Sequence, residues 1–185
     1  MLKNDETTYG WLAILLHWVV ALVVFGLFGL GLYMTSLGYY DPLYRSLPQL
    51  HKGVGVLLFF IVVLRLVWRW INPRPRPEPG LSRFERTASG VVHGLLYLLL
   101  FAIMCSGYLI STADGRPIEV FGLFSLPATI TSIPQQEDVA GLVHLVLAIV
   151  LMALVVLHAL GALKHHFIDR DRTLLRMLGM RRDRS

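Results

Sequence analysis

Residues 139–163 read VAGLVHLVLAIVLMALVVLHALGAL, an apolar run without a formal charge that contains two histidines, His144 and His158. The run exceeds the roughly 20 residues that a helix needs to cross a bilayer. At ~100° and ~1.5 Å per residue, the spacing of the two histidines places them on one face of a helix and ~21 Å apart along its axis. The stretch therefore predicts a membrane-spanning helix with an ionisable side chain near each membrane surface.

Three other apolar runs, at residues 11–34, 48–70 and 87–113, also have spanning length. The chain has 185 residues, of which 55% are hydrophobic and 16% charged, so it holds about four crossings and little else. This composition excludes a separate soluble catalytic domain, and the single cysteine, Cys105, excludes an intrachain disulfide. We predict an all-α integral membrane four-helix bundle, a single domain over residues 1–185, with helices near 11–36, 48–70, 87–112 and 139–166.

Two connecting segments have distinct compositions. Residues 72–80 (NPRPRPEPG) contain alternating prolines, which predict an extended, non-helical connection. Residues 114–138 form the longest loop, and their apolar part, 120–134, is too short and too interrupted by prolines to span a bilayer. We expect that part to lie at the membrane interface.

The distribution of positive charge predicts the orientation. With four crossings, both termini and the second loop share one side of the membrane. That side holds all of the 17 lysines and arginines except Arg45, Lys52 and Arg116, and it includes three arginines at the C-terminal end, Arg181, Arg182 and Arg184. We therefore expect both termini to be cytoplasmic. Topology and anionic lipid then explain the formal charge of +5, which does not indicate nucleic-acid binding.

The chain has seven histidines, and an ionisable residue within an apolar span is by default a functional candidate. The first helix runs outward from the cytoplasm, which places His17 at the depth of His158. The second helix enters from outside, which places His51 at the depth of His144. Topology alone therefore predicts two pairs, an inner pair of His17 with His158 and an outer pair of His51 with His144.

Each predicted pair offers two imidazoles, with no Cys, Asp or Glu on the same face to complete a zinc shell of four ligands. Haem needs only two axial ligands from the protein, and its apolar edge suits the Leu, Val and Phe side chains around these positions. Glycines beside the ligands would leave room for the macrocycle. The chain has no CxxCH haem-attachment motif, and we predict that each of the two pairs binds the iron atom of one haem.

Other polar residues lie at the depth of these pairs. Arg65 falls near the inner pair and is a candidate partner for the haem propionates, and Lys52 is the corresponding candidate at the outer pair. His93 also lies near the inner level, so the residues alone let it compete with His17 as a ligand. His165 and His166, at the end of the fourth helix, are either interfacial side chains or residues that bind or protonate a quinone.

The chain resembles the bacterial cytochrome b561 family from about Tyr9 to Met177. The features that carry the resemblance are His17–Trp18, His51 with Arg65, the His144 and His158 spacing, the loop GRPIEVFGL (115–123) and the tail HHFIDRDRTLLRML (165–178). The resemblance implies a four-helix membrane cytochrome with two b-type haems, bound by His17 with His158 and by His51 with His144. It also implies that His93 is a neighbour of the ligands or part of a quinone site.

A characterised member of this family is a superoxide oxidase. The resemblance therefore implies an oxidoreductase of the bacterial inner membrane that passes electrons from superoxide outside to ubiquinone, with lipid, quinone and superoxide or a periplasmic redox protein as its partners. Arg45, Lys52 and Arg116 are the outer cations that could attract an anionic donor.

Two alternatives stay open. The first is a cytochrome b subunit that transfers electrons for a periplasmic dehydrogenase or hydrogenase. The second is a histidine-based metal transporter, which would show metal flux and no haem absorption. The lack of carboxylates within the spans counts against the transporter.

Overall fold

The computed structural model describes residues 1–78 and 80–180, so Arg181, Arg182 and Arg184, which entered the orientation argument, lie outside the described residues, as does residue 79 of the proline-rich connection. Four long helices dominate the fold: α1 (Trp11–Thr35), α2 (Ser46–Ile71), α3 (Arg83–Thr112) and α4 (Gln136–Phe167). Each is long and apolar enough to cross a membrane. The predicted all-α integral membrane four-helix bundle is therefore confirmed.

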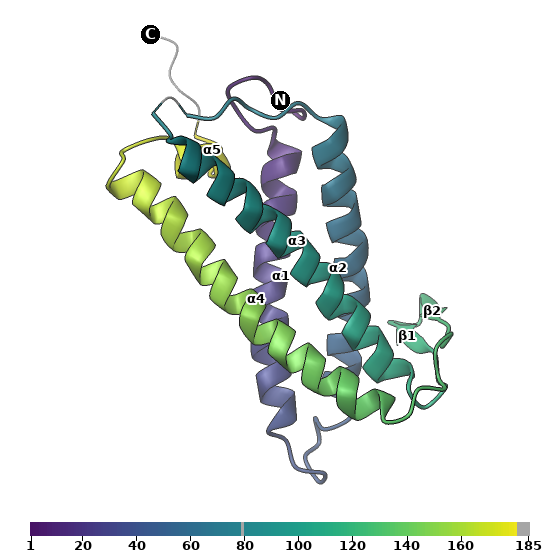
Figure 1. Cartoon of the computed structure of the whole chain (residues 1–185). Helices are drawn as coiled ribbons and strands as arrows, with labels where there is room; N and C mark the ends of the chain where they lie inside the picture. The colour runs from purple at the N-terminus through teal and green to yellow at the C-terminus, as the bar shows by residue number, and fades with distance from the viewer. Residues whose placement is uncertain (79, 181–185) are drawn as a thin grey trace.

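The bundle consists of two antiparallel helix pairs. α1 packs mainly on α2, and α3 packs mainly on α4; in Figure 1 the second pair crosses diagonally in front of the first. The backbones of α1 and α4 make almost no close approach to one another. A small core joins the two pairs, and its buried side chains are Val20, Val24, Leu58, Val62, Leu100 and Leu151. Large apolar side chains on the outer faces are exposed, as expected for helices surrounded by lipid.

α3 and α4 begin four and three residues earlier than the hydropathy pattern predicts, and both differences have a local cause. α3 begins at Arg83 because Ser82 and Glu85 form a capping box, in which the Ser82 hydroxyl accepts from the Glu85 N–H and the Glu85 carboxylate accepts from the Ser82 N–H. α4 begins at Gln136, whose buried side-chain amide donates to the carbonyls of Leu109 and Ile130.

The longest loop contains a β-hairpin that the sequence analysis did not predict. Strands β1 (Ile118–Val120) and β2 (Phe124–Leu126) pair antiparallel, and the turn between them places both Phe121 and Gly122 at positive φ. Ile118 and Val120 are buried, and β1 packs on α2 and α3. The apolar part of the loop is thus folded onto the bundle at the end opposite the termini (Figure 1).

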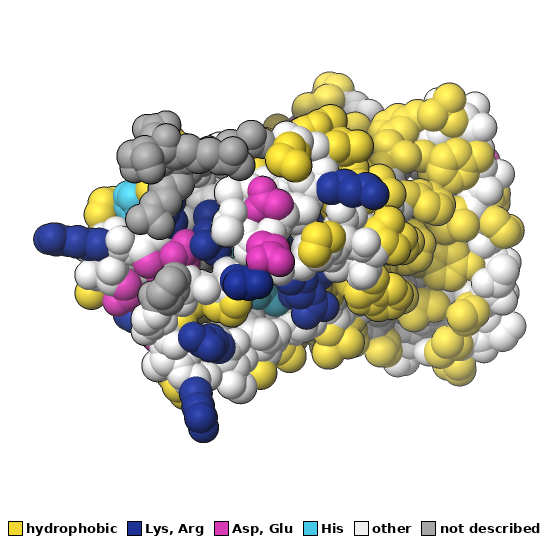
Figure 2. Space-filling view, turned by 90° about the horizontal axis from the view of Figure 1, so that it is seen from above, with side chains coloured by type: hydrophobic (Ala, Val, Ile, Leu, Met, Phe, Trp, Pro, Cys, Tyr) yellow, Lys and Arg dark blue, Asp and Glu magenta, His cyan; other side chains and the backbone are white. Residues whose placement is uncertain are grey.

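The two termini and the α2–α3 connection meet at the other end of the bundle. Asn4 donates to the Pro73 carbonyl, and Arg76 forms an ion pair with Glu6. The short helix α5 (Thr173–Met177) lies against this end, where Arg176 pairs with Glu78. Figure 2, seen from this end, shows Lys, Arg, Asp and Glu side chains gathered here, whereas the helices beyond expose mainly hydrophobic side chains.

The Gln136 side chain at the start of α4 should stabilise the packing of the long loop on α3 and α4, because it donates hydrogen bonds to Leu109 on α3 and to Ile130 in the loop. In Gln136→Leu the carbonyls of Leu109 and Ile130 lose a donor in partly buried surroundings, which typically costs about 1–3 kcal/mol. We expect a lower midpoint of thermal unfolding in detergent, measured by intrinsic fluorescence. The neighbouring Glu137→Gln, at an exposed position, is the control and should unfold like the wild type. An unchanged midpoint in Gln136→Leu would contradict the assigned role.

Candidate functional site: two histidine pairs

The four histidines on α1, α2 and α4 come together as two pairs. The ring centroids of His17 and His158 are 6.2 Å apart, and those of His51 and His144 are also 6.2 Å apart. We call His17 with His158 the terminal pair, because it lies toward the end with the termini, and His51 with His144 the hairpin pair. They correspond to the predicted inner and outer pairs. Each pair joins α4 to one of the other two helices, and all four side chains are partly buried.

The spacing within each pair fits one iron atom between two imidazoles. With about 2 Å from iron to each nitrogen and about 1 Å from each nitrogen to its ring centre, two axial imidazoles have ring centres roughly 6 Å apart. Among the described residues, the Cys, Asp and Glu side chains add no further ligand to either pair: the one cluster with metal-ligand spacing is Glu85, His165 and Asp169. The donor set therefore suits haem better than zinc.

Glycines from neighbouring helices face the hairpin pair. A Cβ atom at Gly31 would lie 3.4 Å from Cε1 of His51, and one at Gly107 would lie 3.2 Å from Cε1 of His144. The second contact is tighter than ordinary van der Waals packing, so Gly107 leaves the space that the His144 ring fills. The sequence analysis considered only glycines that neighbour the ligands along the chain, so it missed both of these, because only the packing of the helices shows which glycine meets which ring.

The Nδ1 atoms of the paired histidines have different partners. Nδ1 of His144 lies 3.0 Å from Oγ of Ser106 on α3. Nδ1 of His17 lies 2.9 Å from Nη2 of Arg65, whose guanidinium also lies 5.4 Å from the centre of the Tyr97 ring. Nδ1 of His51 is buried and has no hydrogen-bond partner among the described residues. Arg65 is therefore at the terminal pair, as its depth predicted, and Ser106 is a site residue that the sequence analysis missed.

The remaining candidates fall into separate surroundings. His93 lies beside the terminal pair, with its ring centroid 5.2 Å from that of His158 and its Nδ1 3.3 Å from the Ser89 hydroxyl. The Lys52 side chain makes no hydrogen bond or ion pair within residues 1–78 and 80–180.

The two histidines at the end of α4 lie among other partners. Nδ1 of His165 is 2.8 Å from Asp169 and 3.1 Å from Asp171, and the His166 ring packs on that of Phe167. Neither is in the cluster formed by the terminal pair.

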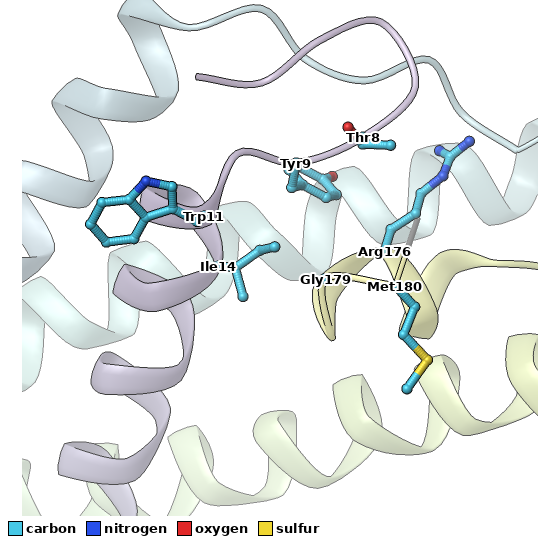
Figure 3. A pocket seen from close by; sticks show the side chains of 7 residues that line it. All are labelled: Thr8, Tyr9, Trp11, Ile14, Arg176, Gly179 and Met180. Atoms are coloured by element: carbon cyan, nitrogen blue, oxygen red, sulfur yellow. The ribbon is translucent and has the colours of Figure 1, made fainter. Parts of the chain in front are cut away.

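A small cavity of about 80 Å³ lies at the end of the bundle that carries the N-terminal segment and α5 (Figure 3). It is lined by Thr8, Tyr9, Trp11, Ile14, Arg176, Gly179 and Met180. Ile14 is one helical turn before His17, and Nε1 of Trp18 donates to the Met177 carbonyl, which holds the α5 segment against α1. The cavity combines an aromatic wall with a phenol and a guanidinium. The sequence analysis did not identify it because its lining comes from both ends of the chain.

The segment before the cavity is ordered by Asp5. Its carboxylate accepts hydrogen bonds from the hydroxyls and backbone N–H groups of Thr7 and Thr8. These bonds hold the pKa of the Asp5 carboxyl well below its usual range, and the bond from the Thr8 hydroxyl has the largest effect. Asp5 therefore stays ionised over the physiological pH range and fixes the turn that leads into α1.

Residues 8–180 match the family described as prokaryotic cytochrome b561. The chain is 51% identical over 176 residues to cytochrome b561 homolog 2 of Escherichia coli strain K12. This match covers 95% of this chain and 94% of the relative. It is 29% identical over 175 residues to the "Probable superoxide oxidase CybB" of Yersinia pestis, covering 94% and 97%, and 30% identical over 183 residues to cytochrome b562 of Cereibacter sphaeroides, covering 95% and 98%.

The close contact at Gly107 leads to a test of the hairpin pair. In Gly107→Ala the new methyl group should push the His144 ring away, and overpacking of this kind costs about 1–3 kcal/mol. We expect about tenfold or greater weakening of haem retention, measured as the haem-to-protein ratio and as the rate of haem transfer to an acceptor protein. The control is Gly94→Ala on the same helix, where a Cβ meets no atom within 4 Å. Equal retention in the two variants would argue against a haem at this pair.

Proposed function

The chain belongs to the prokaryotic cytochrome b561 family, and we propose that it is a di-haem cytochrome that transfers electrons across the bacterial inner membrane. Family membership implies a b-type haem, and together with the four spanning helices it indicates a bacterial membrane protein. One observation carries the proposal of two haems. In each of the two histidine pairs the ring centroids are 6.2 Å apart, and the two pairs lie toward opposite ends of α4.

In this proposal His17 and His158 bind one iron, and His51 and His144 bind the other. With two histidines holding each haem, the haems would supply one-electron exchange rather than oxygen activation. The choice of His17 over His93 is supported by distance: the His93 and His158 rings are 5.2 Å apart, which is short for two imidazoles on one iron, whereas those of His17 and His158 are 6.2 Å apart.

Arg65 and Lys52 are the proposed partners of the haem propionates. Arg65 only donates hydrogen bonds, so its contact with His17 requires Nδ1 of that ring to act as an acceptor. An imidazole that binds iron through Nε2 has its proton on Nδ1 instead. Arg65 would then need another acceptor, and a propionate carboxylate is one. Lys52, adjacent to His51, would serve the hairpin-side haem in the same way.

We place the termini in the cytoplasm on the basis of the positive charge on that side, which puts the hairpin pair toward the periplasm. The two pairs lie ~21 Å apart along α4, and the haem edges would be closer than the irons. Electrons could then cross the bilayer within one chain and without a mobile carrier.

The proposed reaction oxidises two superoxide ions to two molecules of oxygen and reduces one ubiquinone, with two protons, to ubiquinol. Its support is a relative named as a probable superoxide oxidase at 29% identity. Arg45, Lys52 and Arg116 are the proposed attractants for the anion, although Arg116 is paired with Asp114. The proposed quinone site is the cavity one helical turn before His17, where the Tyr9 phenol could donate to a quinone carbonyl.

His93, His165 and His166 are the proposed proton-handling residues near this quinone site. His93 lies beside His158 at the end of the bundle where the cavity is found. Nδ1 of His165 lies 2.8 Å from Asp169 and 3.1 Å from Asp171, so this side chain has two carboxylates beside it at the same end of the bundle.

The spectrum of the reduced protein tests the haem assignment. We expect a sharp alpha band and two haems per chain. His144→Ala should remove about half of the haem, because the hairpin pair loses a ligand and the terminal pair keeps both. His166→Ala, on the same helix outside both pairs, should keep the full amount. A colourless wild-type preparation, or full haem in His144→Ala, would refute the assignment.

Superoxide-driven quinone reduction tests the reaction. Purified protein should form ubiquinol when superoxide is generated, and a haem-free control should not. Ile14→Trp, which fills the cavity, should raise the quinone concentration at half-maximal rate several-fold and leave haem reduction by superoxide unchanged. Leu22→Trp, at a position 70% exposed on the outer face of α1, is the matched control. Rates equal to the haem-free control would reject superoxide as donor, and activity that requires a co-purified protein would favour the subunit alternative.

A further inference from the structure

Ser106 on α3 lies between the His144 ring and its own helix backbone. Its hydroxyl donates to the Ile103 carbonyl at 2.8 Å and lies 3.0 Å from Nδ1 of His144. The residue is only 4% exposed, so no bulk water competes for these bonds. This is the one bond between a serine or threonine hydroxyl and a paired histidine within the described parts of the chain.

The two bonds of Ser106 determine where the protons lie. A backbone carbonyl can only accept, so the hydroxyl proton points to Ile103. The Ser106 oxygen is left with lone pairs, and the bond to His144 therefore needs an N–H on Nδ1. With the proton on Nδ1, Nε2 of His144 carries a free lone pair, which is the state that a metal ligand requires.

We propose that Ser106 is a positioning residue that fixes the tautomer and the ring orientation of His144 for iron binding through Nε2. This inference rests on the proposed haem at the hairpin pair. The neighbouring Gly107 supports it sterically, because its missing Cβ lets the Cε1 and Nδ1 atoms of the His144 ring come close to α3, with Nδ1 at the Ser106 hydroxyl. The adjacent residues Ser106 and Gly107 together give the ring one position and one protonation pattern.

The inference has an electronic consequence. An imidazole that donates from Nδ1 is a more basic ligand through Nε2. A more basic axial ligand stabilises the ferric state and lowers the reduction potential of the haem. His51 has a buried Nδ1 without a described partner, so Ser106 acts on the hairpin-side haem through one ligand only. The terminal pair has no such hydroxyl among the described residues and should be insensitive to Ser106.

The test compares Ser106→Ala with Ser106→Thr in the full-length, haem-loaded protein. Ser106→Ala removes the acceptor and should raise the midpoint potential of one haem, change the low-spin electron paramagnetic resonance signal of that haem, and speed its loss several-fold. Ser106→Thr keeps the hydroxyl and should restore all three. Ser89→Ala, which removes the hydroxyl next to His93 on the same helix, should leave that haem unchanged.

The outcomes separate this inference from the function on which it depends. If wild-type protein shows two low-spin haems and Ser106→Ala is indistinguishable from it, the role of Ser106 is refuted and the di-haem assignment stands. A shift of both haems in Ser106→Ala, or a Ser106→Thr variant that behaves like Ser106→Ala, also refutes it, because either result indicates a general structural effect. A wild-type protein without two low-spin haems refutes the proposed function and this inference with it.

Discussion

The central physical constraint on this structure is the free energy needed to bury imidazole side chains in an apolar helix bundle. A polar side chain inside a membrane protein needs a partner, and an unpartnered one destabilises the fold. Four of the seven histidines meet in two pairs with the same ring separation, one toward each end of α4. An iron porphyrin would give each pair a shared partner and would cover apolar side chains with an apolar ring. The cofactor would then be part of what holds the helices together.

The arrangement of the helices suits this role. α1 packs on α2 and α3 packs on α4, whereas α1 and α4 hardly approach, although each carries a histidine of the terminal pair. The buried core that joins the two helix pairs is small, with Val62 at its centre and 0% exposed. The buried contacts between the helix pairs thus lie near the middle of the four long helices, and the histidine pairs lie on either side of them along the helices. A flat ligand bound at each histidine pair would add apolar contacts between the helix pairs α1–α2 and α3–α4 in the regions where the buried core provides none.

Hydropathy and spacing predicted the helices and the depths of the histidines, because both follow from rise per residue along a helix. They could not predict which neighbour each ring would meet. The spans are apolar on all faces, so their sequences carry little information about rotation around the axis. Ser106 and Gly31 were missed for this reason, whereas the cavity beside Ile14 was missed because its lining comes from both ends of the chain. The β-hairpin was missed because Phe121 at positive φ is unusual for a bulky residue, and only its packing on α2 explains the turn.

The two pairs differ in their electrostatic surroundings, and the difference has a direction. Arg65 places a positive charge beside the terminal pair, and a nearby cation favours the reduced form of iron, because reduction removes one unit of positive charge. Ser106 acts in the opposite sense at the hairpin pair by making His144 a stronger donor to ferric iron. Lys52 would place a cation near the hairpin-side haem as well, but Arg65 directly contacts a ring of its pair and Lys52 does not in the described structure. Under the proposed assignments, the hairpin-side haem therefore has the lower reduction potential and the terminal-side haem the higher. Electrons would then move downhill from the periplasmic side toward the cytoplasmic cavity, which is the direction that an external donor and an internal quinone require.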